Sequence, residues 1–265
     1  MSIFASIWRK LNAPVTDWSG RKVWIIGASS GIGAALASAM LEQGARVAIS
    51  ARRVSMLEGI AQNYEHALVV PLDVLDERSW DQALERIDRE FGEIDLVVFG
   101  AARYDPRHVW DLDLQKVQAS YDLNVVCAYR AAARLAPRLI AQGHGGIAMI
   151  GSISGYTGLP RAIIYGATKA ALQNLTETLY LELAPKGVSV YLISPGFVKT
   201  PMTQANDFEM PGLMTPQAAA QAILKGFSRG VFEIRFPTGF ANVLRLVSRL
   251  PYRIRFALLS RATGG

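Results

Sequence analysis

A tyrosine and a lysine stand four positions apart in the stretch "YGATKAAL", as Tyr165 and Lys169. On a helix, residues i and i+4 are neighbours on one face. A phenol with a pKa near ~10 is a poor acid or base at neutral pH. A cation one turn away favours the phenolate and lowers that pKa, so the pair could act as a tuned proton donor. Packing of a buried tyrosine beside a snorkelling lysine is the alternative, and a site built around the pair decides between them.

A glycine-rich stretch could bind phosphate groups. "GASSGIG", from Gly27 to Gly33, follows the apolar run "KVWII" directly and precedes a helical pattern. Glycines permit a tight turn and close approach of backbone to a ligand. The N-terminus of the following helix offers unpaired N–H groups and a partial positive charge to a pyrophosphate. Glycines also serve ordinary turns, but the order strand, loop and helix favours a dinucleotide site.

The residues after the second apolar run indicate which dinucleotide. The run ends in "SARR", with Ala51, Arg52 and Arg53 where NAD-selective enzymes often place an acid for the adenosine ribose. No carboxylate repels a 2′-phosphate here, and an arginine can bind one with a charge-assisted hydrogen bond. A solvated helix start is the alternative, yet arginine there opposes the helix dipole. The pattern therefore favours NADP(H).

Six short apolar runs must carry these residues on strands. They alternate with longer helical patterns such as 33–43, 77–91 and 114–142. Repeated strand–helix units imply a parallel sheet with helices on both faces and right-handed crossovers. We therefore predict an α/β, doubly wound Rossmann fold in a single domain. The predicted strands span 22–26, 46–50, 67–72, 95–100, 146–151 and 188–194.

Composition excludes several classes of protein. Of 265 residues, 51% are hydrophobic and 19% are charged, which is ordinary for a globular chain. The single cysteine, Cys127, cannot form an internal disulfide, and a reducing, cytoplasmic compartment fits. The histidines His66, His108 and His144 lack metal-ligand spacing, so no metal site is expected. No apolar run is long enough to span a membrane, and the N-terminus lacks the pattern of a signal peptide.

These motifs occur together in an order that resembles the short-chain dehydrogenase/reductase family over about residues 20–235. The glycine spacing matches G-x-x-x-G-x-G, and Tyr165 with Lys169 matches Y-x-x-x-K. Ser152 lies thirteen residues before Tyr165, as is usual in the family. The resemblance also covers Asn124 in "YDLNVV", Asp73 with Val74 in "PLDV", and "SPGFVKTPM". The cofactor-binding residues that it implies are Gly27, Ser29, Ser30, Gly31, Ile32, Gly33, Arg52, Arg53, Asp73, Val74, Gly100, Ala101, Tyr165, Lys169, Pro195, Gly196, Val198 and Thr200.

The resemblance implies an NADP-dependent dehydrogenase or reductase (EC 1.1.1.-). Tyr165 would exchange a proton with a carbonyl or alcohol oxygen, and Ser152 would polarise that carbonyl. Lys169 would lower the Tyr165 pKa and bind the nicotinamide ribose, while Asn124 would hold a water that resupplies protons. An epimerase or dehydratase with the same Tyr–Lys pair is one alternative. A non-catalytic NADP(H) sensor or lipid-surface module is another.

Two places depart from the family pattern. Ile26 stands where threonine is usual before the glycine loop, and "FGAA", Phe99 to Ala102, replaces N-N-A-G. Because these places touch each other in the family, their joint change predicts apolar packing in place of one polar contact.

The segment 200–216 matches the family's substrate lid and is apolar and rich in methionine. It favours an apolar ketone over a small polar sugar, although packing of the lid against the body explains the same residues. The expected partners are this small molecule and further copies of the chain, which would form a homodimer or a homotetramer. No nucleic-acid partner is expected. The predicted substrate residues are Ser154, Tyr156, Leu159, Met202, Phe208 and Met210.

The net charge of +6 is concentrated at the C-terminus. All 22 acidic residues lie at or before Glu233, and six arginines follow it. In 238–250, apolar residues from Phe240 to Leu250 share one helical face, opposite Arg245 and Arg249. A helix packed on the body or a subunit is one interpretation, and peripheral contact with an anionic membrane is the other. We thus divide the chain into an N-terminal arm 1–19, a catalytic domain 20–237 and a basic amphipathic tail 238–265. The stretch "IFASIWRKL" of the arm could add a second contact with the membrane.

Overall fold

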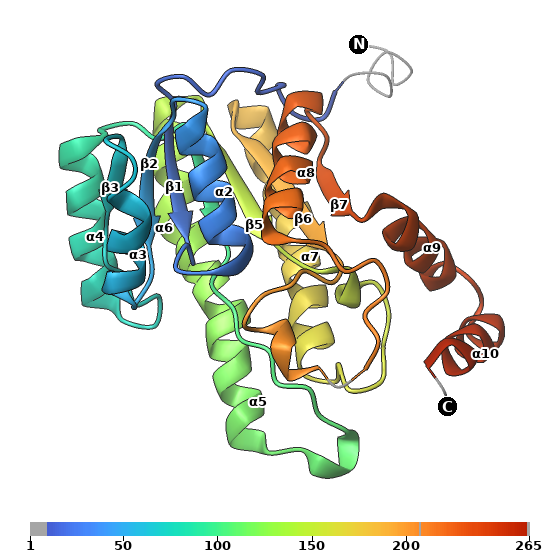
Figure 1. Cartoon of the computed structure of the whole chain (residues 1–265). Coiled ribbons are helices and arrows are strands. Elements are labelled where there is room, and N and C mark those ends of the chain that lie inside the picture. Colours follow the sequence, from blue (N-terminus) through green and yellow to red (C-terminus); the bar gives the residue numbers. More distant parts are fainter. Residues whose placement is uncertain (1–9, 207, 264–265) are drawn as a thin grey trace.

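A computed structural model describes residues 10–206 and 208–263 of the chain. It contains a seven-stranded, fully parallel sheet in the order β3-β2-β1-β4-β5-β6-β7, which confirms the doubly wound class (Figure 1). The strands are β1 (Lys22–Ile26), β2 (Arg46–Ser50), β3 (Ala67–Val69), β4 (Leu96–Phe99), β5 (Gly146–Ile150), β6 (Ser189–Pro195) and β7 (Glu233–Phe236).

Alternation along the strands creates two cores, one on each face of the sheet. In β1, Val23 and Ile25 belong to one core, whereas Trp24 and Ile26 belong to the other. This is the period of two that a strand imposes on its side chains. Because both faces are covered, most residues of the central strands are apolar. The sheet is therefore a rigid platform for the loops at its carboxyl edge.

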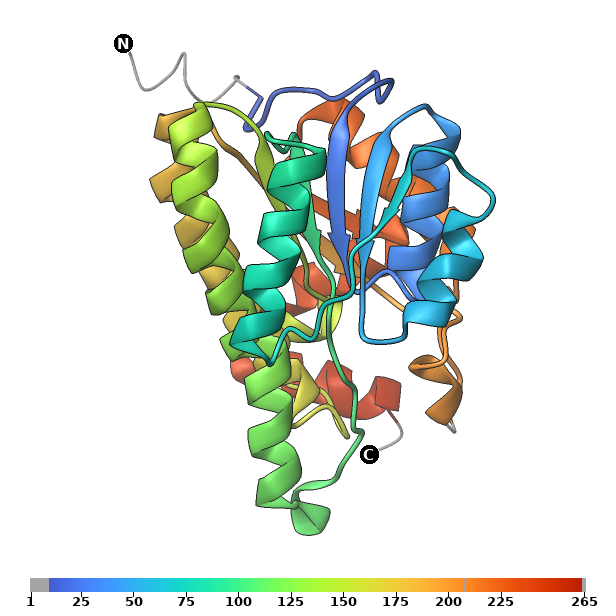
Figure 2. The same cartoon turned by 90° about the vertical axis from the view of Figure 1, so that its left-hand side faces the viewer.

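Helices cover both faces (Figures 1 and 2). One layer holds α2 (Gly31–Glu42), α3 (Val54–Ala61) and α8 (Pro216–Arg229), and the other holds α4 (Glu77–Glu90), α6 (Cys127–Gln142) and α7 (Tyr165–Leu183). The shorter pieces are α5 (Leu114–Tyr121), η1 (Val109–Asp111), η2 (Asp122–Val126), η3 (Ile153–Gly155), η4 (Ala184–Lys186) and η5 (Thr203–Ala205).

Two features differ from the predicted pattern. The six predicted strands omit β7, whose four residues alternate buried Ile234 and Phe236 with the partly buried charges of Glu233 and Arg235. Residues 114–142, predicted as one helix, contain the five-residue π-helical turn η2 between α5 and α6. Such turns are rare and often mark functional positions.

Part of the predicted N-terminal arm packs on the body. The Asn12 side chain is buried, donates to the Val190 carbonyl at 2.9 Å and accepts from the Val190 amide at 3.0 Å. It also donates to the carbonyl of Val231 at 3.2 Å. Trp18 is buried edge-on against Phe227. Residues 12–18 thus close the end of the sheet near β6 and β7, whereas Ile3, Phe4, Ile7 and Trp8 of the proposed second contact lie outside the described residues.

The C-terminal tail forms two helices, α9 (Thr238–Ser248) and α10 (Tyr252–Thr263), beyond the β7 edge (Figure 1). The apolar stripe expected on α9 is divided in the structure. Leu244 is buried against Ile153, while Val243 is 60% exposed. Arg245, expected on the opposite face, reaches inward and pairs with Glu233. Packing on the body therefore explains the inner face of α9.

Candidate functional site

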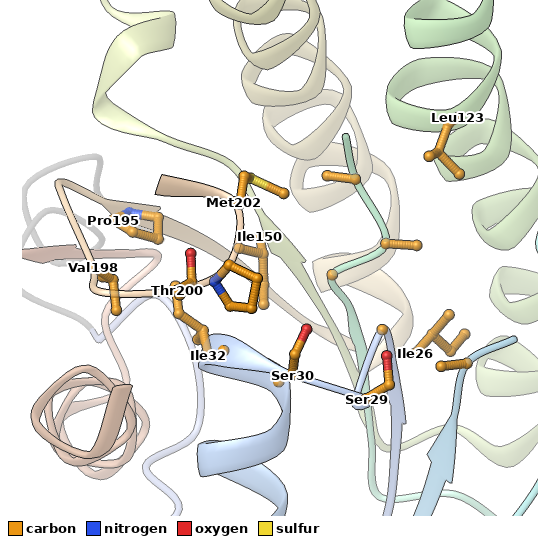
Figure 3. Close-up of a pocket in the computed structure, with 18 of the residues that line it drawn as sticks. Ile26, Ser29, Ser30, Ile32, Leu123, Ile150, Pro195, Val198, Thr200 and Met202 are labelled. Carbon is orange, nitrogen blue, oxygen red and sulfur yellow. The ribbon is translucent and has the colours of Figure 1, made fainter. Parts of the chain in front are cut away.

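A pocket of about 330 Å³ opens at the carboxyl edge of the sheet, beside β1 and β4, where the strand order reverses. This edge is where open α/β sheets bind ligands. Figure 3 shows the glycine loop with Ser29 and Ser30 on one side and the segment from Pro195 to Met202 on the other. The pocket is lined by all the predicted cofactor-binding residues, and also by Ser152 and Met202.

The glycine loop approaches its neighbours so closely that side chains are excluded. A Cβ on Gly33 would lie 2.4 Å from the Gly27 carbonyl oxygen, and one on Gly27, at φ +95°, would lie 2.8 Å from the Ala101 amide nitrogen. At the N-terminus of α2, Ser30 makes no side-chain capping bond and the first turn holds no acidic residue. The backbone N–H groups there are available to a ligand that brings negative charge, so this loop fits a pyrophosphate.

An arginine lies beside this loop. Arg53 Nη2 donates to Ser29 Oγ at 2.9 Å and to Ser30 Oγ at 3.0 Å. Arg52 also lines the pocket, and its side chain is exposed. Since Ala51 follows β2, the position after the strand carries no carboxylate. The two serines and Arg53 form a polar, cationic wall suited to a phosphate group.

Ser152, Tyr165 and Lys169 meet in the same pocket. Ser152 follows β5 and is buried; its Oγ accepts from the Ser154 amide at 3.1 Å and from Ser154 Oγ at 2.9 Å. Tyr165 begins α7, so Lys169 lies one turn further on, with Nζ 5.4 Å from the Tyr165 ring centroid. Lys169 Nζ donates to the carbonyl of Ile150 at 2.7 Å. A hydroxyl, a phenol and an amine thus converge around one point.

Burial dominates the proton affinities of this group. It raises the pKa of Tyr165, an effect that interaction with the Ser152 hydroxyl opposes and that Tyr104 increases. Burial also lowers the pKa of Lys169 to about 7. Lys169 was expected to lower the pKa of Tyr165, but in the structure the loss of solvent around the phenol raises it. At neutral pH the tyrosine is therefore protonated, and the lysine beside it is easily deprotonated.

Asn124 supports the site from the π-helical turn. It is buried, accepts from the Arg103 amide at 2.8 Å, and donates to the Arg103 carbonyl at 2.9 Å. Its Nδ2 also lies 3.1 Å from Thr168 Oγ1, which donates to the carbonyl of Tyr165. The side chain does not itself line the pocket, although its neighbour Leu123 does. Asn124 thus joins the segment after β4 to the first turn of α7.

The two departures from the family pattern lie next to each other. Ile26 is buried in the same core as Phe99, and Ala101 packs against that core. The backbone still connects the two places, because the Gly100 amide donates to the Ile26 carbonyl at 2.8 Å. Ile26 and Phe99 therefore pack as apolar side chains, while the backbone hydrogen bond between Gly100 and Ile26 is kept.

The predicted substrate residues do not all face the pocket. Met202 lines it, and Ser154 touches Ser152. Tyr156 instead donates its hydroxyl hydrogen bond to Glu233. Three others lie further out: Leu159 lines a second, more open hollow, Phe208 packs edge-on against Phe197, and Met210 accepts a hydrogen bond from Asn206. The assignment of these residues to a substrate stays a prediction.

Sequence reasoning overlooked Tyr104. Its ring lies edge-on against Tyr165, with centroids 5.0 Å apart, and its hydroxyl donates to Asn206 Oδ1 at 3.0 Å. It therefore joins the predicted acid to the predicted lid. An aromatic residue five positions after a strand gives no sequence signal for such a contact, because Asn206 lies about a hundred residues further along the chain.

Comparison with known proteins agrees with this geometry. The family model described as short chain dehydrogenase matches residues 21–210. An uncharacterized oxidoreductase from Myxococcus xanthus is 34% identical over 242 residues, which cover 89% of this chain and 95% of that protein. A short-chain dehydrogenase structure from Streptomyces avermitilis has 26% identity and a TM-score of 0.79, covering 93% of this chain and 98% of that one. Another from Sphingobium yanoikuyae, solved in complex with NADPH, has 27% identity and a TM-score of 0.75, covering 88% and 97%. The chain belongs to the short-chain dehydrogenase family.

Proposed function

We propose that this protein is an NADP(H)-dependent oxidoreductase that interconverts a carbonyl compound and a secondary alcohol. The observation that carries the proposal is the convergence of Ser152, Tyr165 and Lys169 in the pocket that also holds the glycine loop. The nicotinamide cofactor, when bound, supplies the hydride chemistry, and the protein supplies placement and electrostatics. The chain's own residues have three tasks: to bind the phosphates, to orient the substrate oxygen, and to move one proton.

Binding falls to the loop and the arginine beside it. The N-terminus of α2 would hold the pyrophosphate through backbone N–H groups. Arg53, already oriented by Ser29 and Ser30, would bind the 2′-phosphate that distinguishes NADP(H) from NAD(H). The Sphingobium yanoikuyae structure, which contains NADPH, supports this choice of cofactor.

Proton transfer falls to Tyr165. In reduction its hydroxyl gives a proton to the carbonyl oxygen, and in oxidation the phenolate takes it back. Ser152 donates a hydrogen bond to the same oxygen and stabilises the negative charge that develops there. Lys169 lies one turn from the phenol and would bind the nicotinamide ribose. Asn124 is hydrogen-bonded to Thr168 in the first turn of α7 and to the backbone of Arg103 after β4. It thereby holds these two segments together.

The surroundings favour an apolar substrate. Met202 and Leu123 line the pocket, and Phe208 of the lid segment packs against Phe197. Such side chains offer little to hydrogen-bond a polyol, so we propose a hydrophobic ketone or the corresponding alcohol.

The test is a screen of NADPH oxidation, followed by absorbance, against ketones graded in chain length and ring size. Net consumption of NADPH, faster with larger apolar ketones and strongly reduced in Tyr165→Phe, is the expected result. Turnover of a substrate without net NADPH consumption would instead indicate an epimerase or dehydratase. Tight NADPH binding without any turnover across the screen would indicate a sensor.

A further inference from the structure

The two C-terminal helices have very different surroundings. On α9, Ala241 and Leu244 are buried against Ile153, the residue that follows Ser152. On α10, no residue is buried, and only Leu259 packs against the same cluster. The inner side of α9 therefore belongs to the fold, whereas α10 presents nearly its whole circumference to solvent.

The exposed surface of this helix pair is strongly apolar. Tyr252 and Phe256 stand one turn apart on α10, on the side of Leu259, and Ile254 and Leu258 form a second such row on the opposite, outward side of the helix. The side chains that are at least 45% exposed are Val243, Leu246, Tyr252, Ile254, Phe256 and Leu258. We call these six residues the tail patch. So many exposed apolar side chains on two adjoining helices point to a site of interaction.

The charge around the tail patch is of one sign. Residues 238–263 carry five arginines and no acidic residue. Arg245 is engaged by Glu233, and Arg255 stacks on Tyr252 and donates to the carbonyl of Leu250. Within residues 10–206 and 208–263, no ion pair is found for Arg249 or Arg253, and both are exposed. The patch therefore offers apolar area and unneutralised positive charge together.

This combination argues against a second copy of the chain as the occupant. A two-fold contact through the tail patch would bring the arginines of both copies together with no carboxylate from either tail between them. Like charges at an interface are unfavourable. An anionic lipid surface suits both the positive charge and the apolar area of the tail patch. Its headgroups neutralise the arginines, while apolar side chains enter the region below the headgroups.

We propose that α9 and α10 dock the protein on an anionic lipid surface through the tail patch. None of the helices described is long and apolar enough to cross a membrane, so this contact is with one leaflet. Arg249 and Arg253 meet the headgroups, and the outward row of α10, Ile254 and Leu258, inserts beside them. The docking itself does not depend on the reaction that the enzyme catalyses.

The docked orientation would bring the lid close to lipid. Phe240 of α9 stacks on Phe197, with centroids 6.2 Å apart, and Phe197 packs against Phe208 of the lid. Phe197 stands between Gly196 and Val198, which line the pocket, so one aromatic layer separates this part of the pocket wall from the tail helix. In this respect the inference rests on the proposed function, since an apolar substrate dissolved in the bilayer would have a short route to the site.

The experiment is co-sedimentation of the full chain with vesicles of phosphatidylcholine alone or of phosphatidylcholine with phosphatidylglycerol. The expected result is binding to the anionic vesicles at low ionic strength and release at high ionic strength. Arg253→Gln should weaken binding about fivefold, the share of one arginine near an anionic surface. Leu258→Glu should weaken it on the order of tenfold or more, because it removes a buried apolar side chain and adds a negative charge.

Matched variants control for charge and for surface exposure. Met56→Glu on α3 changes a side chain that is 48% exposed, against 45% for Leu258, and Arg78→Gln on α4 removes an exposed arginine elsewhere. Both should bind as the unaltered chain does. Circular dichroism and size-exclusion chromatography of each variant are recorded in parallel.

Three results would overturn the proposal. The full chain could stay in the supernatant with anionic vesicles at low ionic strength. The tail and control variants could bind equally well. Leu258→Glu could unfold the protein or dissociate an oligomer, which would show that α10 is covered by protein. NADPH turnover with a water-soluble ketone is measured on the same samples, so loss of docking is distinguished from loss of the proposed activity.

Discussion

The ring of Tyr104 meets the ring of Tyr165 edge-on, with the two planes inclined at 82°. This contact packs one side of the predicted acid without using its hydroxyl. The Tyr104 hydroxyl donates elsewhere, to Asn206 in the lid. The two tyrosines therefore allow proton transfer and aromatic packing to be tested separately.

Tyr165→Phe keeps the ring contact and removes the proton. We expect kcat to fall by ~10²–10⁴, the usual contribution of general acid catalysis, with NADPH binding nearly unchanged. Tyr104→Phe is the matched control: it keeps its ring and loses the hydroxyl that bonds to Asn206, so it should keep most of the turnover. Steady-state kinetics and NADPH fluorescence titration measure both quantities. Near-full turnover in Tyr165→Phe would contradict the assignment.

The pH dependence should differ between the two directions of the reaction. Burial raises the pKa of Tyr165 above its ordinary value near 10, so the phenol is protonated at neutral pH. Reduction needs this protonated form and should be independent of tyrosine titration up to about pH 10. Oxidation needs the phenolate, whose fraction rises about tenfold per pH unit below the pKa.

Oxidation rates should therefore climb through the range from about pH 7 to 10 without a plateau. Burial lowers the pKa of Lys169 to about 7, so this side chain is largely deprotonated over most of the range. Its titration should therefore add no further change in the oxidation rate above about pH 8. Initial rates of alcohol oxidation across this range measure the effect. A plateau beginning near pH 8 would show that a charged Lys169 lowers the Tyr165 pKa in the working complex, as the family resemblance implies.

Cofactor preference should depend on Arg53. A hydrogen bond to a charged group contributes about 1.5–3 kcal/mol, so Arg53→Ala should reduce the preference for NADPH roughly 10- to 150-fold. The loss should appear in kcat/KM for NADPH and hardly at all for NADH. From the sequence, Arg52 was the residue expected to select NADPH, so it is the comparison. Arg52→Ala should have the smaller effect, because the loop serines orient Arg53. Equal kcat/KM for the two cofactors in the unaltered protein would refute the prediction.

The carboxylate of Glu233 should be important for stability. Only 9% of its side chain is exposed, and it accepts hydrogen bonds from Tyr156, Ser194 and Arg245. Glu233→Gln keeps the shape but leaves charged and polar partners incompletely paired, so it should lower the free energy of unfolding by about 1–3 kcal/mol. Glu77→Gln breaks the pairs with Arg130 and Arg134 at a side chain that is 58% exposed, and should lower the free energy of unfolding much less, because solvent screens these pairs. Urea unfolding compares the two, and equal losses would argue against a special role for Glu233.

The parts of the fold that the sequence predicted are those with local signals. The short apolar run of β1 and the glycine spacing of the loop are visible within a few residues. The order of strands and helices then places the carboxyl ends of the strands together, which is why residues as distant as Gly27 and Thr200 could be assigned to one pocket.

The parts that escaped prediction depend on contacts between distant segments. β7 alternates charged with apolar residues and is only four residues long, so it resembles an exposed loop until Glu233 is seen to be enclosed by Tyr156 and Arg245. The raised pKa of Tyr165 follows from burial, which spacing on a helix does not reveal. The helical period of α9 likewise does not reveal which of its apolar residues pack against Ile153, because that contact joins segments far apart in the sequence.

The contacts of Asn12 have a consequence for the order of events during synthesis. Its side chain bonds to the backbone of Val190 and Val231, residues made 178 and 219 positions later. At about 5–20 residues per second, Asn12 waits on the order of 10 to 40 s after its own synthesis for these partners. The beginning of the chain is therefore among the last parts to reach its final place, and a nascent protein released before β7 has emerged would lack the closure at that end of the sheet.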